Sequence, residues 1–262
     1  MTRYLKMLWY FLKVSVQDDA TYRVDFAAHV VMLFFQLAAE LVALYAIFSV
    51  TTSLAGWSTY EILALLGVYR IMIGLITLFI APNMRALMQS IRDGTFDFLL
   101  LMPIDAQFFA SFRRIVMWRM VDIVLGIGIA TFSVWKLQAH VSALSILQFA
   151  VLLSSGAVII YSFWLVLATS AFWFTKLSNI EMVFWNVFEA GRYPVDIYRP
   201  RVRWGLTYVI PLAFLTTFPA GSLVGKTGPM NVGGAIVAAI LSLVVSTMFW
   251  RFGLRRYSGA SA

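Results

Sequence analysis

The residues with the clearest chemical potential are charged side chains inside long apolar stretches. They are Asp25, Glu40, Glu61, Arg70, Arg119 and Asp122. A charge at mid-membrane costs about 2.5–3.5 kcal/mol on insertion scales, so each should face other helices and pair. Arg119 and Asp122 are three residues apart and share a helical face, and Glu40 and Arg70 lie at depths that match across an antiparallel helix pair. We expect these charges to fix helix packing, with a substrate or proton pathway as the alternative interpretation.

A second motif, AGSLVGKT at 220–227, matches a relaxed phosphate-loop pattern. A functional phosphate loop follows a buried strand and opens a helix whose N-terminus holds the phosphates. Here a proline-containing apolar segment precedes the motif, and Gly228 and Pro229 follow it. We therefore predict that this loop binds no nucleotide.

The sequence contains few residues that could carry out other catalytic chemistry or bind a metal. The chain has no cysteine and two histidines, His29 and His140, which excludes disulfides, zinc-thiolate sites and a cysteine nucleophile. No paired-acid, metalloprotease or serine-triad pattern can be argued, and His29 is expected to be a packing residue one turn from Asp25. The sequence thus predicts no metal site and no catalytic activity for the chain alone.

The composition points to a membrane protein. Of 262 residues, 61% are apolar and 12% charged, whereas soluble domains average about 45–50% and about 25%. One soluble core of this size cannot bury so much apolar surface, which argues against a soluble enzyme, a disordered chain or a DNA-binding domain. The net charge of +8 is more typical of cytoplasmic loops facing anionic lipid than of nucleic-acid binding.

Six stretches are candidates for membrane-spanning helices of about 20 residues. They run roughly over 24–50, 60–81, 115–135, 143–172, 204–224 and 231–250. The 204–224 stretch contains Pro211 and Pro219, which break or kink a helix. The predicted fold is all-α and integral to the membrane, a single domain over 1–262 with six transmembrane helices.

Lysine and arginine in the short connections indicate the orientation. Basic residues gather in the N-terminal stretch, in the 82–114 connection and in the C-terminal tail, whereas the loops at 51–58 and 137–142 carry none. Both termini are therefore predicted to be cytoplasmic. Residues 1–23 read as an amphipathic helix lying in the membrane interface, rather than as a signal peptide.

The region 173–230 allows two interpretations. In the first, 204–224 is the fifth span and the basic residues before it are cytoplasmic. In the second, the fifth span runs from about 179 to about 192, and 204–224 is a re-entrant hairpin on the outer side. Insertion energetics favour the first, because Glu181, Glu189 and Arg192 are costly in lipid.

The connection at 82–114 is predicted to form short helices at the cytoplasmic surface. Met84, Leu87, Met88 and Ile91 make one apolar face, Gly94 can end that helix, and Pro103 ends a short apolar segment. Exposed apolar residues in such helices require either the membrane interface or a protein partner.

Two segments resemble permeases of the type-two, exporter-type ABC transporter superfamily. IRDGTFDFLLLMPIDAQFF resembles their segment after the second span, through Gly94, Asp97, Leu99 to Leu101 and Pro103. The stretch before the last span resembles theirs through Gly191, Tyr193, Pro194, Pro211 and Pro219. In this superfamily the last outer segment is commonly re-entrant, which favours the second interpretation of 173–230.

The resemblance implies a permease of the prokaryotic plasma membrane that forms half of an export pathway. It implies a second permease copy or a sister subunit, membrane lipid around it, and cytoplasmic ATPase subunits that bind ATP-Mg, so that this chain binds no cofactor itself. The implied ATPase-coupling residues are Ile91, Arg92, Asp93, Gly94, Phe96, Asp97 and Pro103. An ion- or proton-coupled secondary transporter is the alternative function.

Overall fold

The computed structural model describes residues 2–21, 23–138, 142–174 and 178–257, and its regular structure in these ranges is entirely helical. Five helical stretches are long and apolar enough to span a membrane. They are Phe26–Val50, Thr59–Arg92, Met117–Lys136, Ala143–Phe172 and Pro229–Arg256. A bent helix pair gives up to one more, and the predicted all-α integral membrane fold is confirmed.

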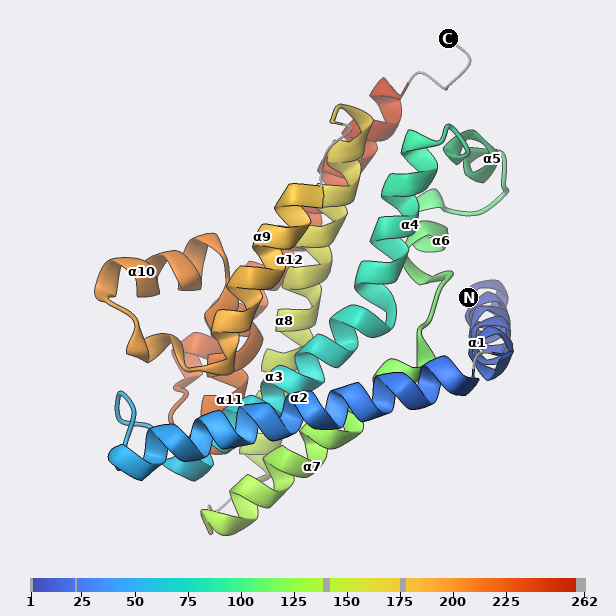
Figure 1. Ribbon diagram of the computed structural model, residues 1–262. Helices are drawn as coiled ribbons and strands as arrows, with labels where there is room; N and C mark the ends of the chain where they lie inside the picture. The colour runs from blue at the N-terminus through green and yellow to red at the C-terminus, as the bar shows by residue number, and fades with distance from the viewer. Residues whose placement is uncertain (1, 22, 139–141, 175–177, 258–262) are drawn as a thin grey trace.

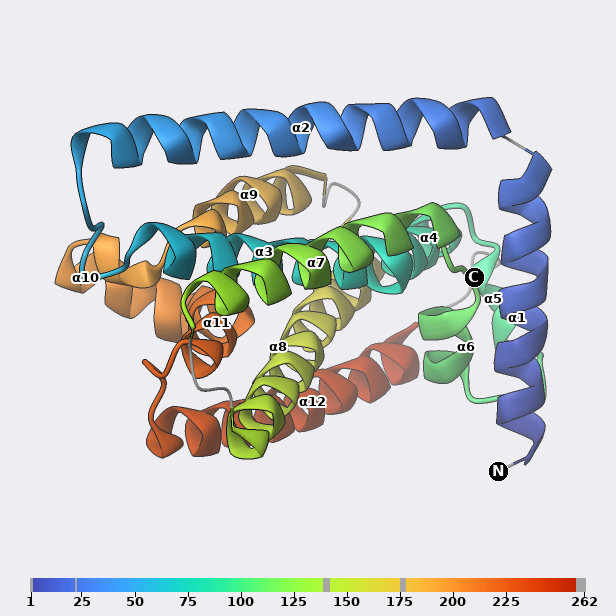
Figure 2. The same ribbon diagram turned by 90° about the horizontal axis from the view of Figure 1, so that it is seen from below.

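Helix α1 (Thr2–Thr21) runs across one end of the bundle, while α2 (Arg23–Val50) runs along its edge (Figure 2). One face of α1 packs on the bundle: Phe11 meets Phe109 edge-on at 5.6 Å, and Ser15 is buried. Leu5 and Trp9 on another face are exposed. An amphipathic helix placed in this way suits a membrane interface.

The second span is longer than predicted. Helix α3 (Thr59–Leu75), a π-helical turn at Ile76–Ile80 and α4 (Ala81–Arg92) form one stretch of 34 residues. At 1.5 Å per residue it is about 51 Å long, well beyond a hydrocarbon core of about 30 Å. It therefore extends past the membrane as one helical rod that bends near its middle (Figure 1).

Pro82 is accommodated inside this rod by contacts from another segment. A proline cannot donate the bond to the carbonyl four residues before it, which here belongs to Leu78. The amide of Val116 donates to that carbonyl at 2.8 Å instead. Asn83 also accepts from the amide of Arg114 at 2.9 Å and donates to its carbonyl at 2.7 Å. The connection before α7 is thus fastened to the start of α4.

The prediction that the apolar face of α4 would be exposed is wrong. Met84, Leu87, Met88 and Ile91 are all buried in the main core. Because α4 continues the second span, this face packs against α8 (Ala143–Thr169) and α6 (Ala106–Phe112) and needs no external partner.

Helices α3 and α7 (Met120–Lys136) approach each other closely through glycines. A Cβ placed on Gly126 would lie 2.6 Å from the carbonyl oxygen of Gly67, and one on Gly67 would lie 2.7 Å from the amide nitrogen of Ala130. Small residues at such crossings let helix backbones touch, which is a common way of packing helices in membranes.

The remaining helices complete the bundle beside this pair. Helix α8 packs along α12 (Pro229–Arg256), and α9 (Ser178–Glu189) lies beside α8 (Figure 1). Trp164 on α8 is fully buried and contacts Phe184 and Trp185 of α9 at ring distances of 5.5 and 6.0 Å. These aromatic contacts hold α9 against the core.

Residues 200–223 form the bent pair. Helix α10 (Pro200–Trp204) continues into a π-helical turn, Gly205–Val209, and a second π-helical turn, Ala213–Thr217, continues into α11 (Phe218–Leu223). The two halves meet at 78°. Pro211 lies at the break, and Pro219 lies in the first turn of α11, where a missing backbone donor is tolerated.

The residues that flank this bent pair on both sides contact the same loop and the start of α3. The indole of Trp57 donates to Asp196 at 3.0 Å, and the ammonium of Lys226 donates to the carbonyl of Gly56 at 2.5 Å and to Glu61 at 2.7 Å. A segment that begins and ends at one side of the bundle enters and returns. This contact pattern is what the re-entrant hairpin of the second interpretation requires, whereas α9, with 12 residues, is shorter than the about 20 residues of a full span.

The energetic argument favoured the other interpretation because it treated the charges of α9 as unpaired. In the structure Arg85 pairs with Glu181, and Arg192 pairs with Glu189 and lies 3.6 Å from Glu40. Ion pairs with residues far away in the sequence thus offset part of the cost of placing α9 among the spans.

Candidate functional site

The centre of the site is Arg70, whose side chain is 1% exposed on α3. Its Nε and Nη2 donate to Glu40 Oε2 on α2 at 3.0 and 2.6 Å, and its Nη1 donates to Asp122 Oδ1 on α7 at 3.2 Å. A guanidinium offers several donors in a rigid plane, so one side chain can bind two carboxylates at once. Arg70 therefore ties three helices together.

Two further arginines complete the cluster, which we call the ion network. Arg119 Nη1 lies 3.5 Å from Asp122 Oδ2, Arg192 Nε lies 3.6 Å from Glu40 Oε1, and Arg192 Nη2 lies 3.3 Å from Glu189. With Arg70, three arginines face three carboxylates and their formal charges cancel. This balance is what allows buried ions in a low-dielectric interior.

The predicted intramembrane charges are largely brought together here. The Glu40–Arg70 and Arg119–Asp122 pairs are both present. The side chain of Asp25 lies outside the part that the structure describes. His29 packs against Trp118, with ring centroids 4.3 Å apart.

Helix α2 depends on this network more than the other spans do. From Phe26 to Val50, Leu33 and Leu44 are its buried large apolar side chains, whereas Met32, Phe35 and Tyr45 are among many that are exposed. Figure 2 shows α2 at the edge of the molecule. Because apolar burial holds it weakly, the bonds from Arg70 to Glu40 are a principal attachment of α2 to the bundle.

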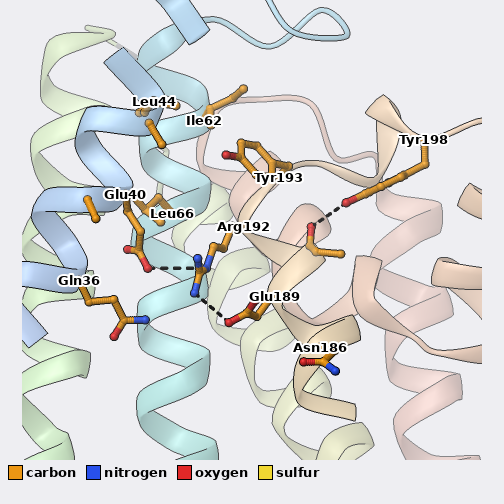
Figure 3. Close-up of a pocket in the computed structure, with 13 residues that line it drawn as sticks. Gln36, Glu40, Leu44, Ile62, Leu66, Asn186, Glu189, Arg192, Tyr193 and Tyr198 are labelled. Carbon is orange, nitrogen blue, oxygen red and sulfur yellow. Dashed lines mark hydrogen bonds and ion pairs between the residues drawn. The ribbon is translucent and has the colours of Figure 1, made fainter. Parts of the chain in front are cut away.

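A cavity of about 520 Å³ lies between α2 and the α9 region, next to the ion network (Figure 3). Its polar lining residues are Gln36, Glu40, Asn186, Glu189, Arg192, Tyr193 and Tyr198. Its apolar lining consists of Leu44, Ile62, Leu66 and three alanines. The volume is in the range typical of small-molecule sites, and the cavity combines an apolar wall with a polar one.

The predicted coupling region lies at the end of the bundle that also carries α1 and the end of α12 (Figure 1). Gly94 has φ +70° directly after α4, a conformation that favours glycine, so it ends the helix as predicted. Phe96 of α5 (Phe96–Leu100) is fully buried against Phe172, Trp250 and Tyr257 at 5.3–6.0 Å. The α5 turn is thereby anchored to the ends of α8 and α12.

Asp97 lies beside the anchor formed by Phe96 and Tyr257. Burial, with a smaller contribution from the Asp97 carboxylate, raises the pKa of the Tyr257 phenol. Asp97 is thus placed at the joint between α5 and α12.

The other predicted coupling residues divide by exposure. Arg92, Asp93 and Pro103 are exposed, Ile91 is buried, and Gly94 and Asp97 are half-buried. The most exposed apolar side chains of this region are Phe98 and Leu101, which are 70% and 81% exposed. Leu101 was part of the resembling segment, but neither residue was among the predicted coupling residues. At helical spacing Phe98 and Leu101 lie on the face opposite Phe96 and Leu99, but both faces are apolar, so the sequence does not indicate which one is buried.

The residues of the second resembling segment, before the last span, lie around the cavity and the bent helix pair. A Cβ on Gly191 would lie 3.0 Å from Leu212, so glycine allows α9 to meet the bent pair closely. Tyr193 lines the cavity, and Pro194 precedes a short turn whose Val195 amide donates to Thr217 at 3.2 Å. These residues connect α9 to the re-entrant segment.

The phosphate-loop-like motif has a structural setting of its own. Gly225 has φ +75°, and Lys226 reaches back to Glu61 and Gly56 and lies over the ring of Trp57 at 4.9 Å. The lysine that would contact a phosphate is thus engaged by an acid, a carbonyl and an aromatic face.

Comparison with known proteins agrees with this architecture. The family described as ABC-2 family transporter protein matches residues 34–261. No curated protein sequence matches the chain. The chain belongs to the ABC-2 transporter family and is a membrane permease component of an ABC transporter, a component that is not itself catalytic. Membership of this family implies partnership with ABC ATPase subunits.

Proposed function

We propose that this permease forms half of the pathway of an ATP-driven exporter, with ATP-Mg bound and hydrolysed on separate cytoplasmic subunits. The observation that carries the proposal is the exposed apolar turn of α5, presented at the end of a bundle that belongs to the ABC-2 family. Exposed apolar patches at polar rims commonly mark docking surfaces. Phe98, Leu101 and their neighbours fit a hydrophobic groove on an ATPase subunit.

The long second span supplies a mechanical link for such coupling. One helical stretch, Thr59–Arg92, carries Arg70 of the ion network and ends two residues before Gly94, which leads into the α5 turn. Movement of an ATPase against α5 would be transmitted along this rod to Arg70. Glu40 and α2 would then shift relative to α9, which would reshape the cavity between them.

The test is reconstitution with ATPase subunits encoded beside this permease. We expect ATP-dependent transport, and we expect Gly94→Val and Asp97→Ala to weaken coupling while membrane insertion stays normal. Gly128→Val is the matched control, since a Cβ at Gly128 has nothing within 4 Å. Absence of any ATPase association would contradict the proposal, and wild-type coupling in both loop variants would show that this region is only an anchor.

The proposed orientation in a prokaryotic plasma membrane has both termini in the cytoplasm. Because the chain has no native cysteine, single cysteines can be mapped with a membrane-impermeant maleimide. Ala55→Cys and Arg201→Cys should react in intact cells, and Asp105→Cys should react only after permeabilisation. Labelling of Arg201→Cys only after permeabilisation would contradict the re-entrant arrangement.

A second permease copy, or a sister subunit, is proposed to complete the pathway. Support comes from the exposed apolar face of α2, which includes Phe35 and Tyr45. Native mass spectrometry from lipid nanodiscs should give a dimer; a monomer that transports with its ATPase would contradict this. Uptake driven through the chain alone by an imposed proton gradient would instead favour the secondary-transporter function.

A further inference from the structure

A different cavity, of about 410 Å³, is bounded by α4, the turn before α7 and α9. Two of its lining residues are arginines, Arg85 on α4 and Arg119 directly before α7. Two more are tryptophans, Trp118 beside Arg119 and Trp185 on α9. Within the described ranges this lining includes no carboxylate. The charged side chains described in the lining are therefore both cations.

The two arginines are more accessible than the acids that pair with them. The Arg85 side chain is 49% exposed, whereas that of its partner Glu181 is 19% exposed. The Arg119 side chain is 31% exposed, whereas that of Asp122 is 2% exposed and is shared with Arg70. A ligand in the cavity would therefore meet guanidinium groups rather than carboxylates.

Neighbouring side chains hold these guanidinium groups in place. The Cζ of Arg119 lies 3.8 Å from the centre of the Trp118 ring. Glu181 accepts hydrogen bonds from Arg85 Nε at 2.5 Å and from the indole of Trp185 at 3.3 Å. A planar guanidinium presents its donors in a rigid fork, a geometry that suits the oxygens of a phosphate. The cavity thus has the charge and the donor geometry of a phosphate site.

The position of the cavity along the rod matches the boundary between lipid headgroups and hydrocarbon. Glu61, which pairs with Lys226, lies near the opposite end of the rod. Arg85 follows Glu61 by about 36 Å at 1.5 Å per residue, more than the about 30 Å of a hydrocarbon core. Ile73 of the same cavity follows Glu61 by about 18 Å. The cavity therefore extends from headgroup level into the hydrocarbon, and tryptophan is enriched at this boundary.

We propose that this cavity binds an anionic membrane lipid, with its phosphate on Arg85 and Arg119 and an acyl chain along the apolar lining. That lining includes Ile73 and Val116. A free phosphate would satisfy the arginines but leave the apolar wall unused, which favours a lipid as the source. Basic pockets between spanning helices commonly bind lipid headgroups. The binding does not depend on the proposed function, whereas its assignment to the cytoplasmic leaflet rests on the proposed orientation.

Native mass spectrometry of the full chain in dodecyl maltoside measures this binding. The probes are phosphatidylglycerol, phosphatidylcholine and a glucosyl diacylglycerol with the same acyl chains, and inorganic phosphate as a competitor. We expect one phosphatidylglycerol to bind about tenfold more tightly than phosphatidylcholine, with no retention of the glucosyl lipid. Equal affinity for phosphatidylglycerol and the glucosyl lipid would overturn the proposal. Displacement of the lipid by an equal concentration of inorganic phosphate would also overturn it, since the site would then take the free anion.

Two variants locate the site. Arg85→Gln and Arg119→Gln each remove a cation from the lining, and each should raise the Kd for phosphatidylglycerol about tenfold, the effect of losing about one charge-assisted hydrogen bond. Arg85→Lys keeps the charge and should lose less. Thermal unfolding without added lipid checks that each variant is folded.

Arg92→Gln is the matched control, because Arg92 is an exposed arginine on the same rod and is not among the residues that line the cavity. We expect it to bind phosphatidylglycerol as the wild-type chain does. Equal losses in Arg92→Gln and Arg85→Gln would show that surface charge alone attracts the lipid, and would overturn the proposal.

The outcomes separate this inference from the proposed function. Wild-type lipid binding by folded Arg85→Gln and Arg119→Gln chains would overturn the site, even if ATP-driven transport is observed. Loss of binding in both variants of a chain that never couples to an ATPase would support the site and refute the exporter.

Discussion

Replacing Arg70 by methionine removes the centre of the ion network and leaves two buried carboxylates without their main partner. Glu40 would retain only Arg192 at 3.6 Å, and Asp122 would retain only Arg119 at 3.5 Å. Methionine keeps much of the side-chain volume and stays apolar. The variant therefore tests the charge pairing rather than the packing.

The expected loss follows from the burial of the three side chains, which are 1%, 6% and 2% exposed for Arg70, Glu40 and Asp122. Removing one partner of a buried ion pair costs about 3–5 kcal/mol. Because each carboxylate keeps a longer contact, we expect the lower end, about 3 kcal/mol. That corresponds to more than a hundredfold in the unfolding equilibrium and to a fall of about 6–12 °C in Tm for a chain of this size.

Thermal unfolding in nanodiscs, followed by tryptophan fluorescence, measures this change. Arg85→Met is the matched control, because Arg85 is an arginine on the same helical rod whose pair with Glu181 is half exposed, at 49% for the arginine. An exposed pair contributes about 0–1 kcal/mol. The control should therefore shift Tm by no more than about 4 °C.

A double variant decides whether the uncompensated charge is the cause. Adding Glu40→Leu to Arg70→Met removes one stranded carboxylate, so the double variant should recover part of the lost stability. A single variant as stable as Arg85→Met would refute the reasoning. So would a double variant that is less stable than Arg70→Met alone.

Three further predictions follow from other contacts. Gly126→Leu should separate α3 from α7 and lower Tm by several degrees, whereas Gly128→Leu, in open space, should leave Tm unchanged; equal Tm values would contradict the close crossing. Lys226→Ala should lower Tm through loss of its contacts to the 51–61 region and should not change nucleotide binding by the purified chain, so saturable binding abolished by this change would revive the phosphate-loop interpretation. Phe98→Ser should reduce ATPase association in pull-downs without changing Tm, while Leu99→Ser, at a buried position, should lower Tm; the reverse pattern would exclude the proposed docking surface.

Much of the fold follows from features that are local in the sequence. Apolar length located the spans, and the spacing of Arg119 and Asp122 predicted their pairing. The match in depth between Glu40 and Arg70 was also sufficient to pair them, because adjacent antiparallel helices place residues at equal depth side by side.

The parts that were missed depend on contacts distant in the sequence. The ion pair between Glu181 of α9 and Arg85 joins residues that are 96 apart in the sequence. The contact between Arg192 and Glu40 likewise joins distant parts of the sequence, so helical spacing could not predict it. In the run FDFLLLM at 96–102, one acid among apolar residues does not indicate which face is buried. Phe172, Trp250 and Tyr257, at the ends of α8 and α12, pack around Phe96 and so determine which face is buried.

The hydrogen bond from Val116 to the carbonyl that Pro82 leaves free has a consequence for motion. A proline after a π-helical turn would ordinarily act as a hinge, but here the residues leading into α7 bridge the bend, and the glycine crossing fastens the two helices again further along. With two separated points of attachment, α3 and α7 have few relative degrees of freedom and should move as one rigid body. During a transport cycle α2 would then be the helix that moves relative to this body. Spin-label distances should change between α2 and α3 but stay constant between α3 and α7.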